Sequence, residues 1–92
     1  MRASRNGITS RKPRILVTDD STVAREGIAA IVRGLPYELC GLTSDQQTTN
    51  DLLQQYQSDL LLIEPFLGNR DGISFVKELK TRFPGTRASF TR

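Results

Sequence analysis

The sequence predicts a three-layer α/β domain built on a parallel sheet. Short apolar runs alternate along the chain with amphipathic stretches, and two of these runs are continuously apolar, which is typical of strands buried on both faces. Strands that alternate with helices favour a parallel sheet with right-handed crossovers and helices on both faces. The size of the chain, 92 residues, allows at most one small domain.

The first strand and helix are predicted near the start of the chain. Residues 15–17 form a β-favouring apolar run, and Ser21 or Thr22 can cap the helix that follows. Gly34 and Pro36 end this helix. The helix carries one broad apolar stripe, formed by Val23, Ala24, Gly27, Ile28, Ile31, Val32 and Leu35.

Two further units are predicted after Pro36. Residues 37–42 alternate in polarity and indicate a more peripheral strand, a polar loop covers 43–47, and 50–57 form a helix with few apolar residues. Residues 60–63, the most hydrophobic run, indicate the central strand.

A loop and a last helix follow the central strand. Residues 64–72 form the loop, because proline, glycine and asparagine punctuate them. Ile73, Val76, Leu79 and Phe83 share one face of a helix over 73–83. The periodic pattern then fails, so we expect about three βα units and an unstructured end at 88–92.

The composition excludes several classes of site. The chain has no histidine and one cysteine, so a zinc site, a histidine-based catalytic triad and an internal disulfide are excluded. Its longest apolar run is far shorter than the roughly 20 residues that a membrane span needs, and no secretory signal is recognisable. We expect a cytoplasmic protein that does not bind membranes.

The net charge of +3 is concentrated at the N-terminus. Residues 1–12 contain four basic residues and no acid, whereas the remainder holds nine basic and ten acidic residues. We expect 1–12 to be a basic disordered tail. Non-specific nucleic-acid binding by so short a tail has little support, so a nucleic-acid partner is not expected.

Acidic residues follow two of the predicted strands. Asp19 and Asp20 come after the first strand, and Glu64 after the third. The carboxyl ends of parallel strands form sites near the point where strand order reverses, and clustered carboxylates suit Mg²⁺ or phosphoryl chemistry. Spacing alone favours a simpler reading, in which Asp19 and Asp20 belong to a helix cap and Glu64 is a solvated loop residue.

Several segments together resemble bacterial response-regulator receiver (CheY-like) domains, especially those that precede a LuxR-type helix-turn-helix. The resemblance covers roughly residues 13–87, which we therefore treat as a partial receiver domain. It is carried by residues 14–28, by Ser58–Glu64 with the loop that closes at Asp71-Gly72, and by Phe83-Pro84-Gly85. The resemblance implies a flavodoxin-like three-layer fold, incomplete here at its C-terminus, and a role in a two-component phosphorelay.

The resemblance also implies roles for individual residues. Asp19, Asp20 and the backbone carbonyl of Phe66 match the Mg²⁺ ligands, and Glu64 falls on the phospho-acceptor position. The family has aspartate at that position. Because glutamate displaces the carboxylate by about 1 Å, which can cost on the order of 100-fold in a geometry-dependent reaction, we expect only weak Mg²⁺ binding and impaired phosphotransfer.

A second departure concerns the end of the chain. The family's later Ser/Thr and Lys, which contact the phosphoryl group, have no expected counterpart, because the strands that bear them are not predicted. The central strand would then have an unpaired, leucine-rich edge, from which we expect marginal stability and self-association.

We therefore interpret the chain as a degenerate, truncated receiver-like module (a pseudo-receiver) without enzymatic activity. Its implied partners are a sensor histidine kinase or another regulator. Two alternatives remain: a phosphorylation-independent interaction module and a non-functional remnant.

Overall fold

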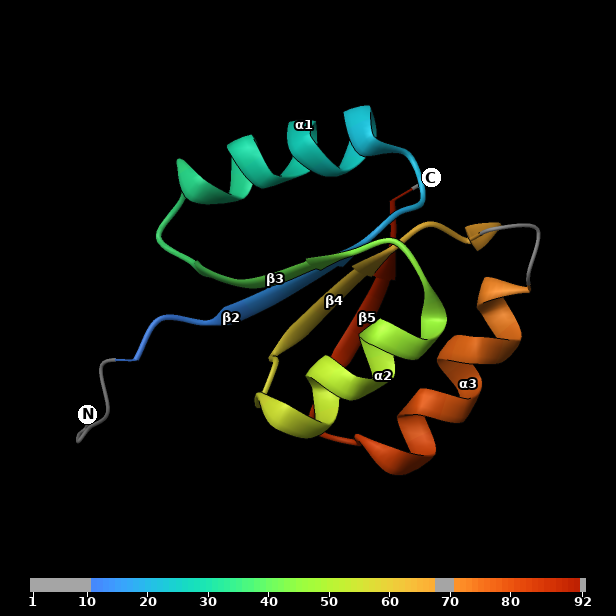
Figure 1. Cartoon of the computed structure of the whole chain (residues 1–92). Coiled ribbons are helices and arrows are strands. Elements are labelled where there is room, and N and C mark those ends of the chain that lie inside the picture. The colour runs from blue at the N-terminus through green and yellow to red at the C-terminus, as the bar shows by residue number, and fades with distance from the viewer. Residues whose placement is uncertain (1–10, 68–70, 92) are drawn as a thin grey trace.

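The computed structural model describes residues 11–67 and 71–91 and shows one sheet with helices on both of its faces (Figure 1). The order of the strands across the sheet is β3-β2-β4-β5, and every neighbouring pair is parallel. The strands are β2 (Arg14–Thr18), β3 (Glu38–Thr43), β4 (Leu60–Ile63) and β5 (Arg87–Phe90). The helices are α1 (Thr22–Arg33), α2 (Gln46–Gln55) and α3 (Gly72–Arg82). The predicted three-layer parallel α/β fold is confirmed.

The two faces of the sheet carry separate hydrophobic clusters. On the α1 face, the buried members are Ile15, Val17 and Val32. On the face covered by α2 and α3, the buried members are Leu16, Leu53, Leu61, Ile63, Phe75, Val76 and Leu79. Successive strand residues point to opposite faces, so β2 and β4 contribute to both clusters and are the central strands. Cys40 packs against the second cluster, and burial raises the pKa of its thiol.

The expected unstructured end at 88–92 is wrong, because β5 extends the sheet beyond β4. Its pairing begins where Arg87 N donates to Asp59 O (3.0 Å), directly after the Thr86 hydroxyl donates to Ser58 O (2.7 Å). Ala88 packs against the core. The sequence pattern missed this strand because parallel pairing is made by backbone groups, and only two of its four side chains are apolar.

The fourth strand also corrects the expectation of an unpaired edge at β4. Leu60–Ile63 pairs with β2 on one side and with β5 on the other, so β4 lies inside the sheet. Among the described residues, the edges of the sheet are β3 and β5.

Helix α1 buries only part of the predicted stripe, namely Val32 and, less fully, Ile28. Val23 and Ile31 are 83% and 66% exposed, whereas Ala29, which lies outside the stripe, is completely buried with Val32. Helix α1 packs on β2 and β3 and buries Ala29 and Val32, whereas Val23, in its first turn, stays exposed.

The other two helices also differ from the prediction: α2 in where it begins, and α3 in which face it buries. Helix α2 begins at Gln46, four residues before the expected start, because Asp45 accepts a hydrogen bond from Thr48 N (2.7 Å) and caps it. In α3, Ile73 is about half exposed and Phe75 is buried instead. The apolar face of α3 therefore starts with Phe75 and continues through Val76 and Leu79.

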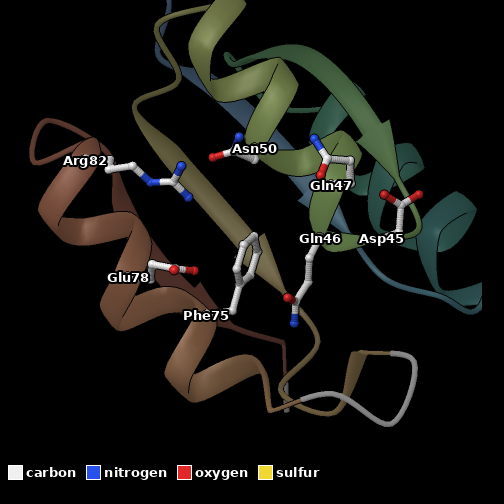
Figure 2. Close-up of a pocket in the computed structure, with 7 residues that line it drawn as sticks. All are labelled: Asp45, Gln46, Gln47, Asn50, Phe75, Glu78 and Arg82. Carbon is white, nitrogen blue, oxygen red and sulfur yellow. The ribbon is translucent and has the colours of Figure 1, made fainter.

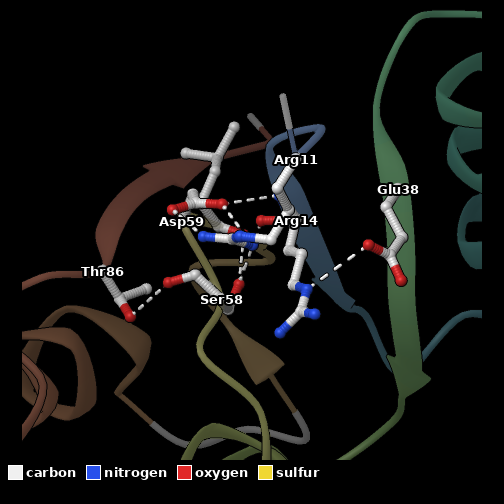
Figure 3. Close-up of polar contacts among 7 residues, drawn as sticks. Arg11, Arg14, Glu38, Ser58, Asp59 and Thr86 are labelled. Carbon is white, nitrogen blue, oxygen red and sulfur yellow. Dashed lines mark hydrogen bonds and ion pairs between the residues drawn. The ribbon is translucent and has the colours of Figure 1, made fainter. Parts of the chain in front are cut away.

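Polar side chains tie the strands together at the amino end of the sheet (Figure 3). The carboxylate of Asp59, which precedes β4, accepts a hydrogen bond from Arg14 N in β2 (2.7 Å) and lies 3.4 Å from the guanidinium of Arg11. The Arg14 side chain in turn pairs with Glu38 at the start of β3 (3.3 Å). We call Arg11, Arg14, Glu38, Ser58, Asp59 and Thr86 the amino-end network.

The predicted disordered tail lies mostly outside the described residues, of which Arg11 and Lys12 are the first. In the part of the chain that is described, no helix is long and apolar enough to cross a bilayer.

Candidate functional site

The candidate site lies where the strands end at their carboxyl side. Backbone hydrogen bonds join the residues that follow adjacent strands: Glu64 N donates to Thr18 O, and Thr91 N donates to Ile63 O, both at 3.0 Å. Asp19 N donates to Thr43 O at the same distance. The topology therefore brings together the ends of all four described strands, as in other open parallel sheets.

Asp19 directly follows β2 and is 1% exposed. Its Oδ1 accepts a hydrogen bond from Ser21 N (2.9 Å), and its backbone carbonyl accepts one from the Arg25 guanidinium (2.7 Å). Ser21 caps α1 by accepting from Ala24 N (3.2 Å). This segment therefore does contain a helix cap, and the capping residue is Ser21. Asp20, next in the chain, is exposed.

Glu64 directly follows β4 and is 2% exposed, so it is not the solvated loop residue of the simpler reading. Its Oε1 accepts a hydrogen bond from Phe66 N (3.0 Å), two residues later. This hydrogen bond closes the turn that follows β4. The Phe66 side chain points outward and is 73% exposed. Sequence reasoning identified the position of Glu64 but not this contact, which depends on how the loop folds.

Gly72 holds this loop against α3 by close approach of backbone to backbone. Its N–H donates to Pro65 O (2.8 Å). A Cβ at this position would lie 2.5 Å from Pro65 O and 3.0 Å from Glu64 O, closer than such atoms can approach. The Asp-Gly pair of the sequence is thus explained by geometry: glycine permits the contact, and Asp71 caps α3.

Both capping aspartates at this end of the sheet are stabilised as carboxylates. Hydrogen bonds from the hydroxyl and backbone N–H of Ser74 lower the pKa of Asp71. The backbone N–H and hydroxyl of Thr48 lower the pKa of Asp45 in the same way. Negative charge is favoured at these helix N-termini because the helix dipole is positive there.

Two completely buried threonines connect β2 to α2. Thr18 Oγ1 and Thr49 Oγ1 are 2.8 Å apart, and Thr49 Oγ1 donates to Asp45 O (2.7 Å). Because a hydroxyl has one hydrogen, Thr49 cannot also donate to Thr18, so Thr18 donates to Thr49. This threonine pair fixes the first turn of α2 against the strand that ends at Asp19.

Thr91 is the residue that sequence reasoning missed. β5, a strand that the sequence pattern did not predict, brings Thr91 beside the end of β4. Its hydroxyl oxygen is buried and has no hydrogen-bond partner among the described residues. The strand-like alternation of residues 87–90 was the available signal, but it was too short to separate from a polar tail.

The expected Mg²⁺ ligands do not form a three-acid group in residues 11–67 and 71–91, where no three Asp, Glu, Cys or His side chains are arranged to hold a metal ion. One oxygen of Glu64 is engaged by Phe66 N, and one oxygen of Asp19 by Ser21 N. The assignment of Asp19, Asp20 and the Phe66 carbonyl to Mg²⁺ stays a prediction. The geometry does not fit a site that requires Glu64 as a third acidic ligand.

A surface hollow lies between α2 and α3 (Figure 2). It is a groove of about 400 Å³ lined by Asp45, Gln46, Gln47, Asn50, Phe75, Glu78 and Arg82. All of these residues except Phe75 are polar or charged, so the groove lacks the apolar lining that is usual for small-molecule sites.

The fold and the site resemble those of receiver domains: a parallel sheet is covered on both faces, and acidic residues lie at the carboxyl ends of its two central strands. No protein-family model matches the chain. Individual proteins are nevertheless similar to it in fold and in sequence. The signal receiver domain of an HD domain-containing protein from Pseudomonas fluorescens Pf-5 superposes with a TM-score of 0.83 at 24% identity, over 91% of this chain and 61% of that one.

Curated proteins show the same similarity in sequence. A protein-glutamate methylesterase/protein-glutamine glutaminase of Anaeromyxobacter dehalogenans is 28% identical over 79 residues, which cover 85% of this chain and 22% of that protein. The transcriptional regulatory protein PdtaR of Mycobacterium tuberculosis is 28% identical over 69 residues, covering 75% and 34%. The chain thus spans about a fifth to a third of these relatives. Its predicted resemblance to response-regulator receivers is confirmed, and its fold is the flavodoxin-like fold of those domains.

Proposed function

We propose that this chain is a receiver-like module of two-component signalling that works without phosphorylation of its acceptor position. The observation that carries the proposal is the Glu64 carboxylate, which is buried and accepts a hydrogen bond from Phe66 N. A phospho-acceptor must present a carboxylate oxygen to an incoming phosphoryl group. Glu64 instead uses Oε1 to hold the turn that follows its strand, and its Oε2 is buried away from solvent.

The length of the side chain supports the same conclusion. Relative to aspartate, the extra methylene moves the carboxylate by about 1 Å, and a displacement of that size can lower the rate of a geometry-dependent reaction about 100-fold. Phosphorylation would convert the Glu64 carboxylate into an acyl phosphate, whose remaining carbonyl oxygen is uncharged and a weaker acceptor for the Phe66 N–H.

Mg²⁺ would have a limited role in such a module. If bound, the ion would be held by Asp19, Asp20 and the Phe66 carbonyl, and it would neutralise the charge of these acids. We propose weak binding, because Glu64 does not complete a three-acid group.

The module would act by binding a protein partner rather than as an enzyme. The partners implied by its receiver fold are a sensor histidine kinase or another regulator, and a cytoplasmic location follows from that role. The loops around Asp19 and Glu64 would keep one conformation, because both carboxylates accept hydrogen bonds from backbone N–H groups of the chain itself.

The test is phosphorylation by a small-molecule donor. The wild-type chain and the Glu64→Asp and Glu64→Gln variants are incubated with acetyl phosphate and Mg²⁺, and each intact mass is measured. We expect no phosphoryl adduct on the wild type or on Glu64→Gln. An adduct on wild-type Glu64, mapped by fragmentation and removed by hydroxylamine, would overturn the proposal.

Glu64→Asp distinguishes the two physical causes. A phosphorylated Asp variant would show that side-chain length alone blocks the acceptor position. An unmodified but folded Asp variant, with an unchanged circular dichroism spectrum, would show that the surrounding loop and strands also prevent the reaction.

A further inference from the structure

The groove between α2 and α3 continues toward the carboxyl end of the sheet. A second hollow of about 440 Å³ adjoins the first, because Gln46, Phe75 and Glu78 line both of them. Asp71 and Ser74 line the added part. We call the combined hollow the α2–α3 groove. It runs along α3 from the N-terminal cap of that helix to its last turn.

Negative charge predominates in the α2–α3 groove. Three acids, Asp45, Asp71 and Glu78, line it, and its described lining includes one base, Arg82. Within the described residues, Glu78 and Arg82 form no ion pair with each other although they lie one helical turn apart. The Arg82 guanidinium lies instead over the ring of Phe83, 5.9 Å from its centroid. The carboxylates of the groove are therefore not neutralised by its one base.

This lining disfavours several classes of ligand. No three acidic side chains in residues 11–67 and 71–91 are arranged to hold a metal ion, so the acids are too far apart for a single cation. Nucleic acids and other anions would be repelled by the carboxylates. A helix with an apolar face would find little to contact, because Phe75, the apolar residue of the lining, is only 6% exposed. The remaining class is an extended ligand that carries several separate cationic groups.

The wall of the groove that α2 provides can also bind a peptide backbone. Gln46 and Asn50 line it with carboxamide side chains, which both donate and accept hydrogen bonds. Figure 2 shows both side chains on the side of α2 that faces α3. Oδ1 of Asn50 is buried and has no hydrogen-bond partner among the described residues. An unpaired buried oxygen costs free energy, so rotation of this amide toward a ligand N–H would be favourable.

We propose that the α2–α3 groove binds an extended, basic segment of a partner protein. Lysine or arginine side chains of that segment would lie beside Glu78 and the two capping aspartates, and its backbone would hydrogen-bond to the carboxamides of Gln46 and Asn50. Its basic residues would lie toward the carboxyl end of the sheet, away from Arg82. This inference rests on the proposed function for the existence of a protein partner, and it adds where that partner binds and which charge it carries.

The test uses the 92-residue chain and a fluorescent peptide in which lysine and serine alternate. Fluorescence anisotropy measures the affinity in a buffer without Mg²⁺ or a phosphoryl donor. The chain has a net charge of +3, so its overall charge repels this peptide, and saturable binding would report a local acidic site. We expect binding that weakens as the salt concentration rises. A peptide of alternating glutamate and serine should not bind.

Glu78→Gln removes one carboxylate from the groove, and the exposed position of Glu78 should leave the fold unaffected. We expect the dissociation constant of the lysine peptide to rise about twofold to fivefold, because one solvent-exposed ion pair is lost. Glu78→Lys should raise it further by repulsion. Glu26→Gln and Glu26→Lys are the matched controls, since Glu26 is exposed on α1, across the sheet from the groove (Figure 1). They should bind like the wild type, and circular dichroism establishes that each variant is folded.

NMR chemical-shift mapping locates the bound peptide independently of the variants. The backbone signals of Gln46, Ser74 and Glu78 should shift on titration, whereas those of α1 should not. Absence of binding even at low salt, or equal weakening by the Glu78 and Glu26 changes, would refute this assignment. Tighter binding of spermine would also refute it, because the groove would then be a site for a free polyamine. Phosphorylation of Glu64 is measured separately by mass, so the two proposals can fail independently.

Discussion

The two ends of the sheet use similar polar residues in very different surroundings. At the carboxyl end, Thr18, Asp19, Thr49 and Glu64 are each at most 2% exposed. At the amino end, the side chains of the Arg11–Asp59 pair are 38% and 44% exposed, and those of the Arg14–Glu38 pair are 30% and 52% exposed. Polar contacts at the carboxyl end therefore contribute more to stability than similar contacts at the amino end. Electrostatic interactions and hydrogen bonds strengthen as water is excluded.

The two ends also differ in which parts of the chain their side-chain contacts join. The contacts of the amino-end network run between residues 24 to 48 positions apart and join strands to one another. The carboxyl-end contacts of Asp19 and Glu64 to backbone N–H groups span two residues and close individual loops. The side-chain contacts at the amino end therefore join strands to one another, whereas those of Asp19 and Glu64 shape the loops of the candidate site.

The largest effect is expected from Gly72→Ala. The new Cβ would collide with the backbone of Glu64 and Pro65, so the loop or α3 must move, at a cost of about 2–3 kcal/mol in the free energy of unfolding. Gly27→Ala in α1 is the matched control, since its Cβ would have nothing within 4 Å. It should stabilise the protein by about 0.5–1 kcal/mol. Urea denaturation measures both, and equal effects would disprove the close-approach argument.

Thr49→Val is expected to lower the free energy of unfolding by a smaller amount. The buried Thr18 hydroxyl would lose its acceptor, which should cost about 1–3 kcal/mol. Replacing both partners, in Thr18→Val/Thr49→Val, should be less destabilising than the sum of the single changes. If a double-mutant cycle measured by urea denaturation shows simple additivity, the two hydroxyls are not coupled.

At the amino end, Asp59→Ala should destabilise the protein by about 1 kcal/mol. It removes the acceptor of Arg14 N and a half-exposed ion pair of small net value. Asp59→Asn, which retains an acceptor for Arg14 N, should recover most of the loss. The ion-pair part of the effect should decrease in high salt, whereas the effect of Thr49→Val should not. Equal salt sensitivity would contradict the difference in burial.

The smallest effect concerns acid stability. The pKa values of Asp45 and Asp71 are lowered in the folded chain, so their contribution is present above the unfolded value of about 3.9 and is lost as pH falls through the lower folded values. Asp71→Asn should therefore flatten the decrease in thermal stability below about pH 4.

Much of the carboxyl end could be predicted from local sequence. Ser21 and Asp71 precede helices, and Asp19 and Glu64 follow apolar runs, so their places in the chain depend on propensities and on connection order. The bounds of α2 were less predictable, because Thr49 is a poor helix former that becomes useful only once its hydroxyl meets Thr18. Tertiary contact outweighed propensity there.

The sequence by itself determined the alternation of strands and helices, the acidic residues that follow two strands, and the resemblance to receivers. It did so because apolar periodicity and capping are local properties. Only the tertiary structure decided that residues 87–90 form an edge strand and that the Glu64 carboxylate is buried against Phe66 N. Strand pairing uses backbone groups that every residue possesses, and the burial of a side chain depends on neighbours distant in the chain.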